Sequence, residues 1–348
     1  MSFTSQKLLK GYIHAATHPL WLAPLSCAIL LAGPAQAQES HSGPNFKGEL
    51  ATGALKVDDR DIDAWAFGLE AGFDGLFTFD DTPLKLSYDF VADFTNAVND
   101  NDALTWTPGN PNGGTDDDIY IRTARLLLIS DYGSLLFAPR IPSGQWNALY
   151  SEIDNYYYNR FHAQTGDIAI FGQVEQASDV IAYVSPTFGG GFRFVGTSLT
   201  LDDANNKDSD VWAARLVYNN AEGLKAGIGH VITNAEQLPT DDDYHRSVAS
   251  LSHEFGRLDL AGIYEINRDH PTGDFDSYGT NVTYDLTNRW TTSLGYAEKR
   301  HDDNEALNER VVVADIKYHL GENTTLFLET GQYEEAHDNI AGGISMKF

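Results

Sequence analysis

The amino-acid sequence predicts an all-β fold, a transmembrane antiparallel β-barrel, and three observations lead to that prediction. Residues 46–348 divide into short segments in which apolar side chains recur at every second position. Short connections alternate along the chain with longer, polar and acidic ones. An export-type leader precedes these segments, and no later apolar run approaches the roughly 20 residues that a membrane-spanning helix needs.

The leader occupies residues 1–37 and contains no acidic residue. Lys7 and Lys10 precede the apolar run 20–32, and the small residues at 35–37 have the Ala-x-Ala pattern of a cleavage site. At about 13 residues, the apolar run is too short to cross a membrane as a helix. We therefore expect cleavage after Ala37 and export of the remaining chain to the bacterial outer membrane. There, only a closed barrel pairs every backbone polar group internally.

The alternation has the period of two that is typical of a strand with one face on lipid and one on water. In 84–94, leucine and aromatic side chains dominate the even positions, and Lys85, Asp89 and Asp93 take odd ones. The same alternation runs through residues 278–286, 290–297 and 312–320.

The connections give the number of strands. The short ones are typical of periplasmic turns and the long ones of extracellular loops. They separate sixteen expected strands, an even number that leaves both chain ends on the periplasmic side. The strands are expected at 46–57, 62–73, 84–94, 119–130, 134–139, 179–185, 191–200, 209–219, 223–232, 244–254, 258–266, 275–285, 289–299, 310–320, 324–334 and 340–348. A barrel of this strand number encloses a water-filled channel, because side chains cannot fill it.

The charge of the chain excludes a nucleic-acid partner. Two of the 23 Lys and Arg residues lie in the leader and none of the 50 acidic residues does, so cleavage moves the formal charge from −27 to −29. Phosphate binding needs clustered basic residues, which this composition does not offer. The acidic excess instead attracts cations or reflects a saline habitat. The only cysteine, Cys27, lies in the leader, so the exported protein has no disulfide.

Enzymatic motifs are missing from the sequence. The 11 histidines are scattered, no G-x-S-x-G is present, and His253-Glu254 lacks the second histidine of H-E-x-x-H. No D-x-D-x-D-G calcium loop with a closing Glu is present either. We therefore expect no catalytic residues, no metal site and no cofactor.

Three segments carry a resemblance to a known family. The chain ends in an alternating strand, 340–348, that closes with Phe348; 125–140 places a tight Asp-Tyr-Gly turn between two strands; and 179–192 joins a strand to Ser-Pro and Gly-Gly-Gly. In these features, and along essentially the whole exported chain, the sequence resembles the Gram-negative porins. The resemblance implies a homotrimer, in which the loop 95–118 can reach a neighbouring subunit, and recognition of Phe348 by the barrel-assembly machinery.

The resemblance also implies that the long loop after the fifth strand, 140–178, folds into the lumen as a constriction. Its Tyr156, Tyr157, Tyr158 and Phe161 can pack against the inner wall and leave the carboxylates facing the lumen. The alternative is a surface loop that solvates its charges. The candidate acidic side of the constriction consists of Glu152, Asp154 and Asp167, with Glu175 nearby.

Basic residues on the barrel wall are expected to oppose these carboxylates. The candidates are Lys47, Lys85, Arg122, Arg125 and Arg140. Alternation points Lys85 inward, but it gives Arg122 and Arg125 opposite faces unless a bulge lies between them. Facing charges of opposite sign would create a transverse field that selects solutes by size and charge.

We therefore expect a channel for passive diffusion of small hydrophilic solutes and ions, with weak cation selectivity from the acidic loops 95–118 and 233–243. The alternatives are a substrate-specific uptake channel and, from another class, a secreted acidic β-sandwich that binds a ligand. The expected partners of a channel are outer-membrane lipid and lipopolysaccharide.

Overall fold

The computed structural model describes residues 42–80, 82–99, 119–142, 149, 152–153, 155–161, 170–173, 176–201, 209–220, 222–235 and 242–348. The expected leader, 1–37, lies outside these residues, as does most of the acidic loop 95–118.

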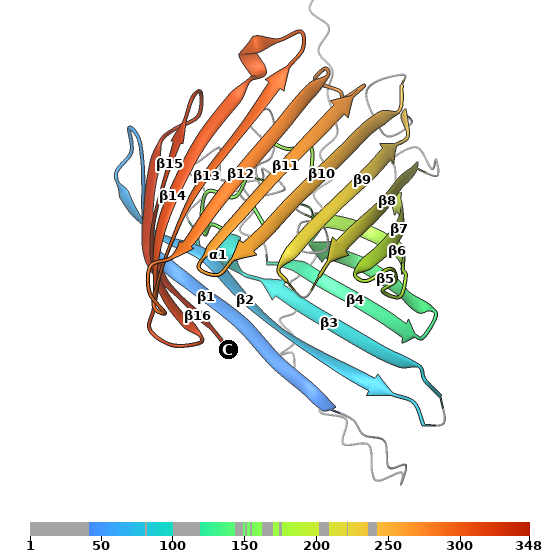
Figure 1. Ribbon diagram of the computed structural model, residues 1–348. Helices are drawn as coiled ribbons and strands as arrows, with labels where there is room; N and C mark the ends of the chain where they lie inside the picture. Colours follow the sequence, from blue (N-terminus) through green and yellow to red (C-terminus); the bar gives the residue numbers. More distant parts are fainter. Residues whose placement is uncertain are drawn as a thin grey trace, which may run out of the picture. The chain divides into compact units, whose positions relative to one another are not determined.

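A single closed antiparallel barrel contains all sixteen strands of the described chain (Figure 1). Each strand pairs with its neighbours in sequence, and the first pairs with the last. The strands are β1 (Ser42–Val57), β2 (Ile62–Thr78), β3 (Lys85–Asp93), β4 (Tyr120–Ser130), β5 (Gly133–Pro142), β6 (Gln176–Val184), β7 (Phe192–Leu201), β8 (Ser209–Asn219), β9 (Leu224–Thr233), β10 (Tyr244–Phe255), β11 (Leu258–Arg268), β12 (Phe275–Asp285), β13 (Trp290–His301), β14 (Glu309–His319), β15 (Thr324–Tyr333) and β16 (Asn339–Lys347). The fold predicted from sequence is confirmed, and a sheet without free edges excludes the β-sandwich alternative.

Burial in this barrel is inverted relative to a soluble protein. Leu251 and Leu294 are 58% and 56% exposed, whereas Glu265 and Glu329 are 0% and 1% exposed. An outward apolar band around a polar interior is the pattern of a barrel that faces lipid outside and water inside. Among the described residues, no helix combines the length and hydropathy needed to cross a membrane.

Several strands extend beyond the ends that the sequence analysis expects, and three of these extensions, in β2, β5 and β6, matter for the loops. β2 continues to Thr78 because its last residues pair in register with the start of β3. β5 continues to Pro142 and β6 begins at Gln176, so the long loop between them is 143–175 and not 140–178. Arg140 therefore belongs to a strand. We call residues 143–175 the third loop.

A short helix that the alternation does not predict, α1 (Thr95–Val98), follows β3. Thr95 Oγ1 accepts the backbone N–H of Leu69 at 2.8 Å, and Asn99 Oδ1 accepts that of Ala66 at 2.8 Å. β3 no longer runs beside this part of β2. The side chains of Thr95 and Asn99 therefore replace the strand that would otherwise accept these backbone N–H groups.

Close backbone contact marks the seam, where β1 pairs with β16. Gly53 lies directly opposite Gly343, and a Cβ on Gly53 would overlap the carbonyl oxygen of Gly342. Phe348 and Gly48 exchange backbone hydrogen bonds of 3.1 and 2.8 Å at one end of the seam. The barrel therefore closes through a point of close backbone contact at Gly53 and Gly343, where a side chain has no room.

Replacing Gly53 with valine is expected to prevent closure, because the side chain needs space that backbone atoms occupy. The folded fraction should fall strongly. It is measured as the share of protein whose electrophoretic mobility changes when the sample is heated. Gly262→Val is the matched control, since the nearest backbone atom to a Cβ there is 3.8 Å away. Equal folding of both variants would show that the seam tolerates side chains.

Candidate pore constriction

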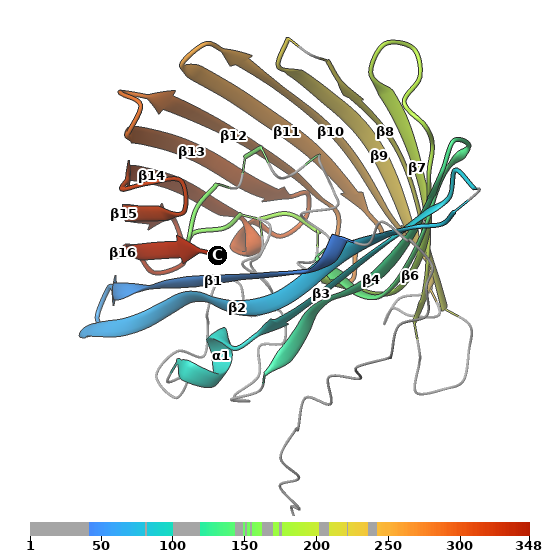
Figure 2. The same cartoon turned by 90° about the horizontal axis from the view of Figure 1, so that it is seen from below.

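The described parts of the third loop lie inside the ring of strands (Figure 2). Tyr156 and Phe161 are buried in an apolar cluster with Val311 and Val313 of β14. Tyr158 is buried in a second cluster that includes Leu55 of β1. Aromatic packing against the inner wall thus keeps the loop away from the surface, which excludes the solvated-loop alternative for these residues.

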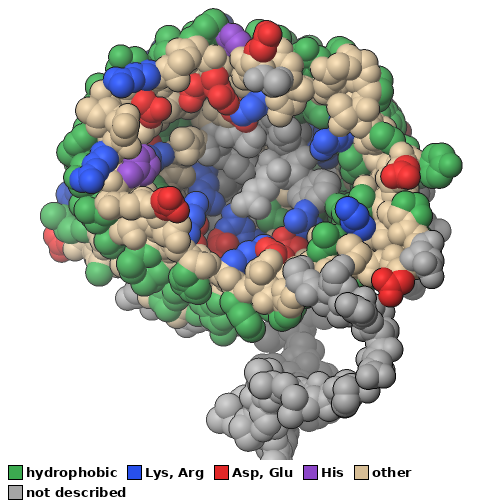
Figure 3. Space-filling view, turned by 60° about the horizontal axis from the view of Figure 1, so that its bottom comes forward, with side chains coloured by type: hydrophobic (Ala, Val, Ile, Leu, Met, Phe, Trp, Pro, Cys, Tyr) green, Lys and Arg blue, Asp and Glu red, His purple; other side chains and the backbone are tan. Residues whose placement is uncertain are grey.

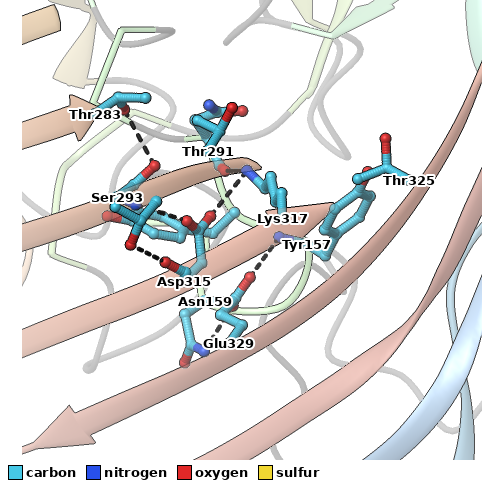
Figure 4. A network of polar contacts seen from close by, with 12 residues as sticks. Tyr157, Asn159, Thr283, Thr291, Ser293, Asp315, Lys317, Thr325 and Glu329 are labelled. Carbon is cyan, nitrogen blue, oxygen red and sulfur yellow. Dashed lines mark hydrogen bonds and ion pairs between the residues drawn. The ribbon is translucent and has the colours of Figure 1, made fainter. Parts of the chain in front are cut away.

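A single carboxylate fixes the turn of the third loop (Figure 4). Glu329 of β15 accepts the backbone N–H groups of Tyr157 at 2.8 Å, Tyr158 at 3.2 Å and Asn159 at 2.7 Å. The side chain of Asn159 donates a fourth hydrogen bond to it at 2.7 Å. Hydrogen bonds to an ionised acceptor are stronger than neutral ones, so this one side chain is the main polar anchor of the loop.

Neighbouring wall residues add further anchors. Lys317 Nζ donates to the backbone carbonyl of Asn155 at 2.5 Å and pairs with Asp315 at 2.9 Å. Tyr156 donates its hydroxyl to Asn281 Oδ1 at 2.8 Å, and Tyr157 stacks on Phe327 with ring centroids 4.0 Å apart. This part of the loop is thereby held by β12, β14 and β15, and the backbone N–H of Ser293 on β13 donates to Asp315 at 2.8 Å.

The returning arm of the third loop has its own attachment. Gly172 donates its N–H to Glu265 at 2.6 Å, and Arg246 donates to the Gly172 carbonyl at 2.5 Å. Arg246 also donates to Gln173 Oε1 at 2.7 Å and lies 3.9 Å from Glu265. Buried charges of opposite sign therefore hold both backbone polar groups of Gly172.

Sequence reasoning did not single out these anchors. Their only signal in the sequence is that each is a charged residue at an inward position of its strand. The anchors outside the third loop are Arg246, Glu265, Asp315, Lys317 and Glu329.

The first four strands carry a ladder of alternating charges on the lumen wall. Asp89 of β3 accepts hydrogen bonds from Lys47 Nζ at 2.6 Å and from Arg125 at 3.0 Å. Lys47 also lies 3.3 Å from Asp74 of β2. The basic candidates on this wall are thus brought together, but they are interleaved with carboxylates.

A bulge places Arg122 beside this ladder. The register between β3 and β4 shifts between Val91 and Ala92, which reverses the alternation between Arg122 and Arg125. Arg122 forms an ion pair with Glu70, which lies four residues before Asp74 on the inward face of β2. Both arginines therefore have acidic partners on the inner wall, and the conflict in their alternation disappears.

The two remaining basic candidates lie elsewhere. Lys85 is exposed at the start of β3, next to the short-turn end of the barrel. Arg140 donates to Gln176 Oε1 at 2.5 Å and to Ser178 Oγ at 2.8 Å, both on β6. Neither residue joins the charge ladder around Asp89.

On the candidate acidic side, Glu152 lies 3.0 Å from Lys225 Nζ of β9. Lys225 also lies 3.4 Å from Glu254 of β10. β9 is eight strands from β1 in the sheet order, so this group lies across the lumen from the charge ladder. Asp154 and Asp167 lie outside the described residues. Side chains of both signs line the inner rim when the barrel is seen from its short-turn end (Figure 3).

Burial also shifts proton affinities in the loops. It raises the pKa of Tyr156 and Tyr158, so both phenols stay neutral in the constriction. In the loop between β11 and β12, burial, followed by the charges of Lys299, His301 and Arg246, lowers the pKa of His270 to about 4.

This shift predicts a loss of stability in acid. The unfolded chain takes up a proton on His270 as the pH falls through 6.5, whereas the folded site stays neutral until about pH 4. The urea concentration at the midpoint of unfolding should therefore be highest above pH 6.5 and should fall between pH 6.5 and about pH 4. His270→Phe, which keeps ring contacts with Tyr244 and Phe275, should reduce the decline, and the exposed His337→Phe should not. A decline unaffected by His270→Phe would place the titrating group elsewhere.

The family model described as Gram-negative porin matches residues 25–338. An anion-selective porin from Comamonas acidovorans superposes with a TM-score of 0.66 at 16% identity, covering 88% of this chain and 99% of that one. OmpF of Salmonella typhi, in a complex with daunomycin, gives a TM-score of 0.69 at 14% identity, covering 88% and 97%. The trimer form of in-vitro folded OmpT from Vibrio cholerae gives 0.62 at 12% identity, covering 88% and 98%. No curated protein matches this chain.

Proposed function

Because this chain belongs to the Gram-negative porin family and is an outer-membrane channel, we propose that it conducts small hydrophilic solutes and ions by passive diffusion with weak cation selectivity. The observation that carries the proposal is the third loop, anchored inside the barrel by Glu329 between two charged walls. Such a loop narrows the lumen without closing it, and the fixed charges then select among the solutes that fit.

The balance of the two walls supports cation selectivity. Around Asp89, the three cations Lys47, Arg122 and Arg125 have three acidic neighbours, so that wall is close to neutral. Across the lumen, Lys225 is paired with both Glu152 and Glu254, which leaves an acidic excess. We propose that the undescribed Asp154 and Asp167 add to the acidic side. One structural neighbour is named an anion-selective porin, so the sign of selectivity depends on these side chains and not on the fold.

The reversal potential of the purified protein in a planar bilayer under a KCl gradient tests both parts of the proposal. Conductance steps with a cation-biased potential are the expected result. An anion-biased potential would overturn the selectivity and leave the channel intact. Absence of conductance from folded protein would overturn the diffusion channel itself.

We further propose the assembly expected from the family. Residues 1–37 are removed during export, Phe348 is read by the barrel-assembly machinery, and three copies associate among outer-membrane lipid and lipopolysaccharide. The apolar outer face and the pairing of Phe348 with Gly48 support this proposal. N-terminal sequencing and cross-linking of the membrane-extracted protein test it: a retained leader or a monomer would contradict it.

A further inference from the structure

The lumen wall beside the third loop contains a cavity whose lining is unusual for a water-filled channel. Its volume is about 340 Å³, within the range of small-molecule sites. Porin interiors are polar, yet aliphatic side chains dominate this wall from β5 to β9. One row of lining residues crosses five strands in register and consists of Ala182, Thr197, Ala213, Val231 and Arg246.

A second row lies two residues farther along each strand and contains Leu199 opposite Val211. Gly172 and Gln173 of the third loop also line the cavity, and Arg246 holds both of them. The cavity is therefore a built pocket between the wall and the anchored loop, with an apolar floor.

One amide nitrogen in this pocket has no hydrogen-bond partner within the described part of the chain. Gln176, at the start of β6, lines the cavity and is 8% exposed. Its Oε1 accepts a hydrogen bond from Arg140, which has no acceptor atom, so the identity of the two amide atoms is fixed. Its Nε2 is buried and has no hydrogen-bond partner among the described residues. A buried donor of this kind is costly unless an acceptor reaches it.

From these observations we propose that the cavity is a binding site for amphipathic organic carboxylates. The aromatic or branched aliphatic body lies on the two apolar rows, and a carboxylate oxygen accepts from Gln176 Nε2. Arg215, which also lines the cavity, supplies positive charge, and Arg140 is a positioning residue that aims the amide. The inference rests on the diffusion channel proposed above, since a solute reaches the cavity from the lumen.

Benzoate is the probe, and acetate and benzyl alcohol are its matched controls: acetate lacks the apolar body and benzyl alcohol lacks the charge. Titration calorimetry of the folded protein in detergent should show saturable benzoate binding. Both controls should bind roughly tenfold more weakly or worse, since each loses one of the two contributions. Equal binding of benzoate and acetate, or of benzoate and benzyl alcohol, would overturn the assignment.

Two variants test the residues. Gln176→Leu removes the donor at similar size and should weaken benzoate binding about tenfold. The exposed Gln332→Leu should not weaken it. Ala213→Phe fills the cavity and should abolish binding, whereas Ala214→Phe, which changes the exposed opposite face of the same strand, should not. Unchanged binding in both cavity variants would overturn the proposal.

KCl conductance distinguishes a failure of the cavity site from a failure of the diffusion channel. A protein that conducts KCl but shows no saturable benzoate binding overturns the cavity site and leaves the diffusion channel. A folded protein that does not conduct overturns the channel proposal on which the site rests.

Discussion

Glu329→Ala is expected to release the third loop from the wall and to raise single-channel conductance. The substitution leaves three buried backbone N–H groups without their acceptor, and the Asn159 amide keeps only its bond to Asn339. Unsatisfied buried donors of this kind cost about 1–3 kcal/mol each, so docking of the loop should weaken by roughly 3–5 kcal/mol once water reaches some of them. Planar-bilayer recordings measure the result.

The size of permeating solutes gives a second measurement of the same effect. Liposomes with Glu329→Ala should admit larger sugars than liposomes with the unmodified protein, because the obstruction in the lumen is displaced. Glu322→Ala, at an exposed acidic residue in the turn between β14 and β15, is the control and should behave as the unmodified protein. Unchanged conductance and exclusion limit in Glu329→Ala would show that apolar packing alone holds the loop.

Asp89→Asn is expected to shift the reversal potential toward anions. The side chain is 10% exposed and bonds to both Lys47 and Arg125, so its neutral analogue leaves an excess positive charge on the lumen wall. In the partly screened lumen, one added charge is worth about 1 kcal/mol to a passing ion, a roughly fivefold fall in the cation-to-anion permeability ratio.

Two comparisons make the Asp89 result specific. Asp131→Asn, at an exposed residue of the turn between β4 and β5, removes the same charge outside the ladder and should produce a smaller shift. The effect of Asp89→Asn should also shrink as the salt concentration rises, since screening shortens the reach of the charge. Equal shifts in the two variants would show that total charge, and not the ladder, controls ion selectivity.

The strands were predictable because the same physical rule applies to each strand separately. Lipid on one side and water on the other force alternation, so every strand such as 312–320 reports its own face without knowledge of its partners. The ends of strands were less predictable, because they depend on partners. β2 continues through Thr78 only because β3 begins opposite it.

The candidate site was harder to predict for the same reason. Alternation pointed Lys85 inward but could not show the bulge that brings Arg122 to Glu70, because a bulge is a property of the strand pair. Nor could it show which inward carboxylates hold the third loop. Glu329 and Glu152 are both acidic residues in the sequence, yet one is buried under three loop peptides and the other meets Lys225.

The seating of Tyr158 has a consequence for the order of biogenesis. Its ring is buried in a cluster that contains Leu55 of the first strand together with Phe327 and Ala341 of the last two. Asn159 likewise bonds to Asn339 of the last strand. The third loop can therefore reach its final position only after the last two strands have paired. The loop in the lumen and the closure of the barrel are thus completed in the same step of folding.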